Sequence, residues 1–109
     1  MARELREPSF FVLAALLDGP LHGYGIIKRA EQLSEGAVRL APGTLYGALD
    51  RLTGVGLIER NGHEIVDGRS RHYYKLTSAG RASLLAEAAR LDRAARTVLE
   101  QAGAVSVAT

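Results

Sequence analysis

The chain has 109 residues, of which 47% are hydrophobic and 24% are charged, so it can build one core but lies near the size at which a partner often completes it. It contains no cysteine, which excludes disulfides and thiolate metal sites and gives no sign of an oxidising compartment. The longest apolar run, Phe10 to Leu17, is about half of what a membrane span needs, and the N-terminal segment is too acidic for a signal peptide. We therefore expect a cytoplasmic protein of one domain.

Two helices are expected in the first third of the chain. Pro8 begins a helix whose apolar run extends nearly all round, and Asp18-Gly19-Pro20 ends it. A short helix that is apolar on every side needs cover on more than one side. The second helix is predicted to begin at His22 or Gly23 and to end around Gly36, with an inward face formed by Ile26, Ile27, Ala30 and Leu33.

A third helix is predicted to begin at Pro42, because the missing N–H of proline would be unpaired there in any case and its φ is already helical. Gly54 and Gly56 supply the flexible backbone that ends a helix. Apolar residues recur at helical spacing along one face, namely Leu45, Ala48, Leu49 and Leu52. That face is predicted to belong to the core.

The opposite face of the third helix combines very small residues with hydroxyl and guanidinium groups, namely Gly43, Thr44, Tyr46, Gly47, Asp50 and Arg51. Each glycine costs about 1 kcal/mol of helix stability relative to alanine but lets the backbone come close to another surface. The hydroxyls and the guanidinium can bind phosphate or base edges, and the first-turn N–H groups favour phosphate. An ordinary amphipathic helix would explain the leucines but not the glycines. We therefore predict that this face approaches DNA.

Two antiparallel strands are predicted to follow. Residues 57–60 have β-propensity, residues 72–76 alternate like a half-buried strand, and Asp67-Gly68 is a two-residue turn signal. Asn61-Gly62 is a competing turn, which would place a third strand at 71–76. We favour Asp67-Gly68 as the tip, with Asn61-Gly62 as a bulge. Val38 to Leu40 is expected to add a short strand beside this hairpin, the wing.

Positive charge is concentrated on the wing. Between Asp67 and Glu87 the chain has no acidic residue. It has four cationic residues there, namely Arg69, Arg71, Lys75 and Arg81. Tyr74 and Leu76 are predicted to face inward. The outer face then presents Arg71, Tyr73 and Lys75 for phosphate or minor-groove contact. The alternative is a solvated edge strand protected by its charges, which the neighbouring third helix disfavours.

The last helix is predicted to mediate homodimerisation. Thr77 is a good N-cap, and an unbroken heptad seam follows it, formed by Leu84, Ala88, Leu91, Ala95, Val98 and Ala102 and widened by Leu85 and Leu99. The first helix, with Phe10 and Phe11, is the natural additional contact. Packing of the last helix within its own chain is the alternative. A two-fold dimer would present the third helix of each subunit, as a DNA-recognition helix, to a pseudo-palindromic operator with half-sites about one DNA turn apart.

Catalysis is disfavoured, although several residues are chemically capable of it. His63, Glu64, Asp67 and His72 are possible metal ligands, and Ser70 and Ser78 possible nucleophiles. They lie on or beside an exposed hairpin, their spacing fits no zinc pattern, and no phosphate-binding glycine loop is present. We expect no enzyme activity, no metal and no cofactor. His22 is expected to cap a helix or to join a structural hydrogen bond.

Several short segments occur in a characteristic order and spacing, namely Leu21-His-Gly-Tyr24, Pro42-Gly-Thr-Leu-Tyr46 with Leu49 and Arg51-Leu52, Gly56-Leu-Ile58, Gly68-Arg69, and Arg71-His-Tyr-Tyr-Lys-Leu-Thr77. With these segments the chain resembles the PadR-type winged helix-turn-helix regulators over about residues 8 to 100. The single helix after the wing is similar to the short subfamily, which implies a dimeric DNA-binding repressor or regulator. The resemblance also implies that Tyr24 reaches the DNA backbone, whereas a buried tyrosine is the alternative. Ala41 stands where serine is common, so an N-cap hydroxyl is missing.

The predicted fold class is therefore mainly α with a small antiparallel β wing. A winged helix-turn-helix DNA-binding domain is expected at residues 1–76, and a dimerisation helix with a short tail at 77–109. The expected function is sequence-specific transcriptional regulation, as a homodimeric repressor. The family resemblance further implies a small apolar or aromatic effector between the subunits. A winged-helix module that binds a protein instead of DNA is the alternative function.

Overall fold

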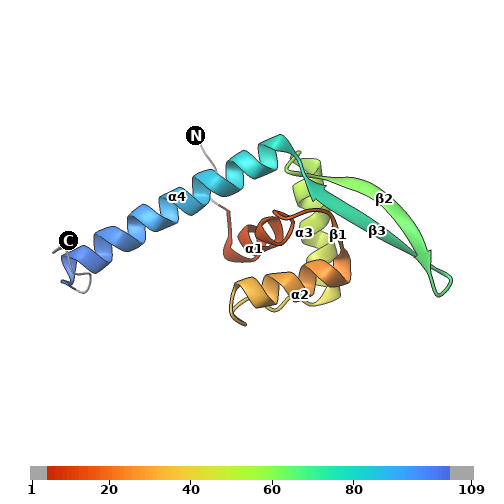
Figure 1. Ribbon diagram of the computed structural model, residues 1–109, viewed down its shortest axis with the longest axis horizontal. Coiled ribbons are helices and arrows are strands. Elements are labelled where there is room, and N and C mark those ends of the chain that lie inside the picture. The colour runs from red at the N-terminus through yellow and green to blue at the C-terminus, as the bar shows by residue number, and fades with distance from the viewer. Residues whose placement is uncertain (1–4, 104–109) are drawn as a thin grey trace.

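The computed structural model describes residues 5–103, which form four helices and one three-stranded antiparallel sheet (Figure 1). In chain order these are α1 (Glu7–Ala15), β1 (Leu21–His22), α2 (Gly23–Leu33), α3 (Pro42–Gly54), β2 (Ile58–Val66), β3 (Arg69–Leu76) and α4 (Ser78–Gln101). None of the helices in this part of the chain has the length and apolarity needed to cross a membrane.

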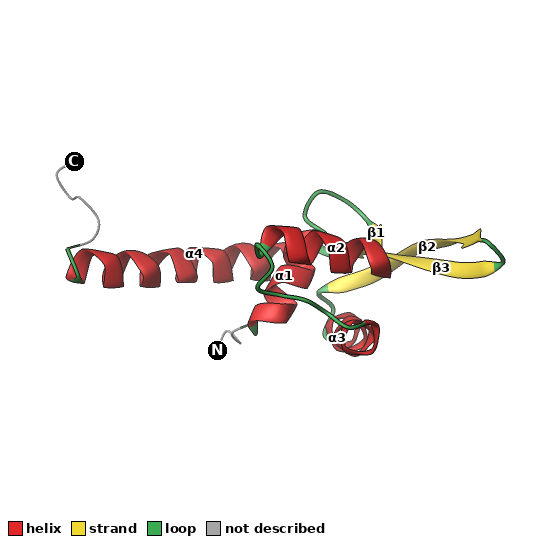
Figure 2. Cartoon of the chain, turned by 90° about the horizontal axis from the view of Figure 1, so that it is seen from below, coloured by secondary structure: helices red, strands yellow, loops and turns green. Residues whose placement is uncertain are grey.

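The molecule is elongated. Its radius of gyration is 16.2 Å, whereas a compact chain of this size would have about 13 Å. Figures 1 and 2 show the reason, since the hairpin of β2 and β3 and the far half of α4 project from the body in opposite directions. Figure 2 also shows α3 end-on beside the base of the sheet, crossing the direction of α4.

The core lies between α1, α2, α3 and the base of the sheet. Its largest fully buried side chains are Val12, Leu13, Leu16, Ile26, Leu45, Leu49 and Ile58. The apolar face predicted for the third helix is buried as a whole, so that prediction is confirmed. Phe10 and Phe11 of α1 are only half-buried, and their rings meet edge to face with centroids 5.2 Å apart.

The wing closes where the sequence indicated. Asp67 and Gly68 have φ values of 52° and 76°, the left-handed pair that a tight two-residue hairpin turn requires. Val66 pairs with Arg69 across this turn, and the register shifts by one residue between Arg60 and His63. The predicted tip and the predicted bulge at 61–62 are both confirmed.

The third strand is not where it was expected. Val38 and Leu40 lie in an irregular link between α2 and α3 with their side chains buried, and they form no strand. The free edge of β3 is occupied instead by β1, in which Leu21 pairs with Tyr74 and His22 with Tyr73. The apolar character of residues 38–40 therefore reflects burial in the core rather than pairing in the sheet.

The start of α4 is anchored to the body of the protein. The Thr77 hydroxyl accepts a hydrogen bond from the Gly80 N–H at 2.9 Å and donates one to the Gly56 carbonyl at 2.6 Å, which confirms the predicted N-cap. Leu84 belongs to the core. The first turns of α4 thus pack with the wing domain, and the domain division at 76/77 stays a prediction. The short predicted tail after 103 lies outside the described residues.

Candidate nucleic-acid interface

The outward face of α3 is open to solvent. Gly43, Thr44 and Arg51 are exposed, and Tyr46 is 51% exposed. Ala41 is the N-cap residue of α3, and its side chain forms no capping hydrogen bond. Pro42 follows it in the first turn, so the first-turn N–H groups have no side-chain acceptor. The helix therefore presents free donors, a phenol and a guanidinium along one side.

No contact within the described chain requires a glycine at position 43 or 47 of α3. A Cβ added at Gly43 would meet no atom within 4 Å, and one at Gly47 would meet only the Arg51 guanidinium, 3.8 Å away. Both glycines lower helix stability without allowing any close approach inside the protein. The space that they leave faces outward.

Gly23, at the start of α2, has the opposite role. A Cβ at this buried position would lie 2.8 Å from the Tyr46 hydroxyl and 3.4 Å from Leu45. The glycine thus lets the N-terminus of α2 approach α3 and fixes where the Tyr46 phenol rests. Sequence reasoning missed this contact, because two helices that are distant in the chain meet there.

His22 caps α2, as the sequence predicted. Its Nδ1 accepts a hydrogen bond from the Gly25 N–H at 3.2 Å, and its ring meets the Tyr73 ring edge to face with centroids 5.5 Å apart. Burial, and next the Arg71 guanidinium, lower the pKa of His22, and Glu64 opposes this shift. The imidazole is therefore kept neutral and serves as a hydrogen-bond acceptor.

This lowered pKa predicts a stability loss in acid. The folded protein binds a proton at His22 less readily than the unfolded chain, so the contribution is fully present above about pH 6.5 and is lost as the pH falls through the lower pKa of the folded state. His22→Asn keeps a capping acceptor but does not titrate. Urea unfolding at about pH 7.5 and about pH 5 should show a larger loss for the wild type than for H22N. Equal losses would contradict the assignment.

Tyr24 is 66% exposed, so the alternative of a buried tyrosine is excluded. The Lys28 ammonium lies 5.6 Å from the centre of its ring, and the His22 ring is parallel to it at 6.5 Å. A phenol and an ammonium are thus held together on the exposed side of α2. Both groups can bind a phosphate oxygen.

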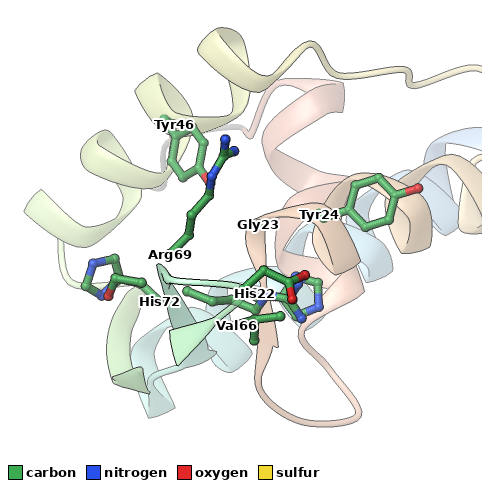
Figure 3. A pocket seen from close by; sticks show the side chains of 10 residues that line it. His22, Gly23, Tyr24, Tyr46, Val66, Arg69 and His72 are labelled. Carbon is green, nitrogen blue, oxygen red and sulfur yellow. The ribbon is translucent and has the colours of Figure 1, made fainter. Parts of the chain in front are cut away.

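A groove of about 500 Å³ separates the wing from the two helices (Figure 3). Figure 3 shows Tyr46 on α3, Tyr24 on α2, and the Arg69 side chain extending from the wing in the direction of Tyr46. The lining residues are His22, Gly23, Tyr24, Tyr46, Val66, Asp67, Arg69, Ser70, Arg71 and His72. Four of the ten residues predicted to contact DNA line this groove, namely Tyr24, Tyr46, Arg69 and Arg71. In the described chain, Arg51 and Arg69 form no ion pair.

The outer face of the wing is more balanced in charge than the sequence suggested. Tyr74 is buried, as predicted. On the other side of β3, Arg71 lies 3.9 Å from Glu64, and Lys75 lies 3.5 Å from Glu59. The Tyr73 hydroxyl donates to Glu64 at 2.6 Å, and this hydrogen bond is the main reason why the pKa of Tyr73 is raised. Arg71, Tyr73 and Lys75, which were predicted to contact DNA, therefore already have acidic partners within the wing.

The residues considered as metal ligands do not converge. His63 and His72 are cross-strand neighbours with ring centroids 5.8 Å apart, and the Arg60 guanidinium lies 3.5 Å from His72 Nδ1. Within residues 5–103, no three His, Cys, Asp or Glu side chains are placed to hold one metal ion.

The predicted dimer seam needs one correction. Leu84 is only 3% exposed and packs in the core of its own chain, so it is not available to a partner. Further along α4 the apolar side chains are exposed, namely Leu85, Leu91, Val98 and Leu99, and the alanines at 95 and 102 are exposed with them. Glu87, which the sequence pattern did not single out, is buried and accepts two hydrogen bonds from Arg90, and these lower the pKa of Glu87.

Comparison with known proteins places the chain in a family. The model of the Transcriptional regulator PadR-like family matches residues 12–86. The chain is 44% identical over 96 residues to a 37.1 kDa protein in transposon TN4556 of Streptomyces fradiae, an alignment that covers 88% of this chain and 26% of that protein. It is 39% identical over 88 residues to the transcriptional regulator Rv3488 of Mycobacterium tuberculosis, covering 81% and 78% of the two chains.

A solved structure shares the fold. Bacillus subtilis PadR, crystallised in complex with operator DNA, superposes with a TM-score of 0.63 at 25% identity, over 72% of this chain and 45% of that chain. The predicted fold class, a winged helix-turn-helix followed by a long C-terminal helix, is confirmed. Proteins of this family are transcription regulators and not enzymes. The chain belongs to the Transcriptional regulator PadR-like family.

Proposed function

We propose that this protein is a sequence-specific DNA-binding repressor that acts as a homodimer on a pseudo-palindromic operator. The observation that carries the proposal is the open, glycine-containing face of α3, where Gly43 and Gly47 serve no packing purpose within the described chain. A helix without side chains at these two positions can lie deep in a major groove, which is about 12 Å wide. The operator complex of Bacillus subtilis PadR supports the same use of a related fold.

The proposed contacts divide into two groups. Thr44, Tyr46 and Arg51 project from α3 and would reach base edges, which carry sequence information. Tyr24 on α2 and Arg69 on the wing would bind backbone phosphates, which position the protein without specifying a sequence. The other proposed contact residues are Gly43, Gly47, Arg71, Tyr73 and Lys75.

The proposed dimer forms through the distal part of α4. Val98 is 65% exposed, and it shares its helix face with Leu91 and Ala95 at heptad spacing. Beyond its first turns, α4 projects away from the body (Figure 1), and the described part of its own chain leaves Leu91 and Val98 of this apolar face exposed. The other proposed interface residues are Phe10, Phe11, Ala88, Leu99 and Ala102. Sedimentation of the intact chain over a range of concentrations should show a dimer.

We also propose that a small apolar or aromatic effector relieves repression by binding between the subunits. The half-buried rings of Phe10 and Phe11 would form part of such a cleft. Titrating aromatic acids into the complex of dimer and operator, with release of duplex as the signal, tests this proposal.

The central experiment measures duplex binding as salt rises. Duplexes selected from a random pool should lose affinity by about 1000-fold or more between about 50 and about 200 mM salt. Arg69→Ala should weaken binding to all duplexes by a similar factor, because Arg69 is assigned to phosphate. Arg51→Ala should also alter which duplexes are selected, with about 1–3 kcal/mol of discrimination lost at one base pair.

A different outcome would favour the other candidate function. If the purified dimer shows no salt-sensitive affinity for any duplex, the fold acts as a protein-interaction module. If R51A and R69A lower affinity alike and leave the selected sequence unchanged, α3 does not read base edges.

A further inference from the structure

One carboxylate on the wing holds two of the residues proposed to contact DNA. In the register of the hairpin, Glu64 of β2 lies directly opposite Arg71 of β3, two pairs beyond the Val66–Arg69 pair at the tip. The Tyr73 hydroxyl donates to Glu64 Oε1 at 2.6 Å, and Arg71 Nη1 lies 3.9 Å from the same oxygen. A single oxygen atom therefore attracts a phenol and a guanidinium that project from the outer face of β3.

A carboxylate and a DNA phosphate compete for the same donors. Both present anionic oxygens to guanidinium and hydroxyl groups, with the same preferred hydrogen-bond geometry. Arg71 borders the groove between the wing and the helices, so a phosphate lying along the wing would meet it. The Glu64 and Arg71 side chains are 49% and 40% exposed, which leaves their pair weak and open to exchange.

Glu64 differs in this respect from the other acidic residue on the same face. Glu59 forms its ion pair with Lys75, near the base of the hairpin, and Lys75 borders the surface beside Arg81 instead of the groove. Glu64 has two donors, and one of them belongs to the groove lining.

We propose that Glu64 is an internal competitor of the DNA backbone. In the free protein it occupies the donors of Arg71 and Tyr73, and a backbone phosphate displaces it on binding. The inference rests on the proposed DNA-binding function. It adds that the affinity for DNA is limited, because every duplex must displace Glu64 from the same two donors. Glu64 thus lowers affinity for DNA of any sequence.

Glu64→Gln tests the proposal, since the amide keeps an acceptor for Tyr73 but loses the charge. The probe is a duplex of random sequence, followed by fluorescence anisotropy at about 100 mM salt. E64Q should bind more tightly than the wild type by about fivefold for each wing that contacts the duplex, the effect in water of one unit charge at about 4 Å. Glu31→Gln is the matched control, because it removes the same charge from an exposed site on α2; it should change affinity less than about twofold.

A double-mutant cycle separates competition from a general charge effect. In an Arg71→Ala, Tyr73→Phe background the donors are gone, so E64Q should gain less than about twofold. A gain that persists in that background overturns the proposal. Affinity of E64Q equal to or below that of the wild type also overturns it and would make Glu64 a positioning residue. A wild type without salt-sensitive duplex binding refutes the proposed function itself, a result that the wild-type protein alone provides.

Discussion

Gly80→Ala is expected to destabilise the fold by about 3 kcal/mol, the upper range for overpacking a core. An added Cβ would overlap the Leu57 carbonyl, a rigid backbone group, and would press on Leu76 as well. The carbonyl has little freedom to retreat, because it accepts the Thr77 N–H at 3.1 Å, at the N-cap of α4. The gain of about 1 kcal/mol that alanine normally brings to a helix is too small to offset this.

The measurement is urea unfolding at a fixed protein concentration, since dimerisation would make stability depend on concentration. Gly54→Ala is the control: it is also a helical glycine, but its Cβ would meet no atom within 4 Å. That variant should be as stable as the wild type or up to about 1 kcal/mol more stable. If G80A unfolds at the same urea concentration as G54A, the close approach of α4 to the Leu57 carbonyl, just before β2, is not essential.

Features that depend on neighbouring residues were predictable. Asp67-Gly68 specifies its turn by two left-handed residues, and the bulge at 61–62 follows from the length of the two arms. Thr77 and His22 each cap the helix that begins after them, a signal that lies within three residues. The two faces of α3 follow from helical periodicity alone.

Features that depend on tertiary contacts were not predictable. β1 has only two residues, and it is a strand because the chain passes the free edge of β3 there. A heptad pattern does not distinguish a partner from the chain's own core, so Leu84 was assigned to the dimer although it is buried within its own chain. Gly23 and Gly80 permit contacts between distant segments, which no local pattern indicates.

The charge balance of the wing is an intermediate case. The sequence between 67 and 87 contains no internal acid, and on this basis β3 was predicted to be a free cationic strand. The tip at Asp67-Gly68 implies the register, and counting outward from it pairs Glu64 with Arg71. The signal was therefore present in the sequence, but it emerges only when charges are counted across a hairpin instead of along the chain.

Gly47→Leu and Gly43→Leu are each expected to reduce duplex affinity by about 100-fold, equivalent to about 2.7 kcal/mol, without destabilising the protein. In the free chain an added Cβ would meet no atom within 4 Å at Gly43 and only the end of the flexible Arg51 side chain at Gly47. We therefore expect a larger side chain to be accommodated at both positions and helix propensity to improve. In the proposed complex the same side chain would fill the space between the α3 backbone and the DNA. Stability and affinity should therefore change in opposite directions.

Gly54→Leu is the matched control for this pair. It makes the same substitution in the same helix, also in open space, but at the C-terminal end, which the proposed contacts do not include. Anisotropy titrations should find its affinity within about twofold of the wild type, while urea unfolding confirms that all three variants are folded. Full affinity in G43L and G47L would mean that α3 does not approach the duplex through this face, and the glycines would then need another explanation. Loss of affinity in G54L alone would move the contact to the opposite end of the helix.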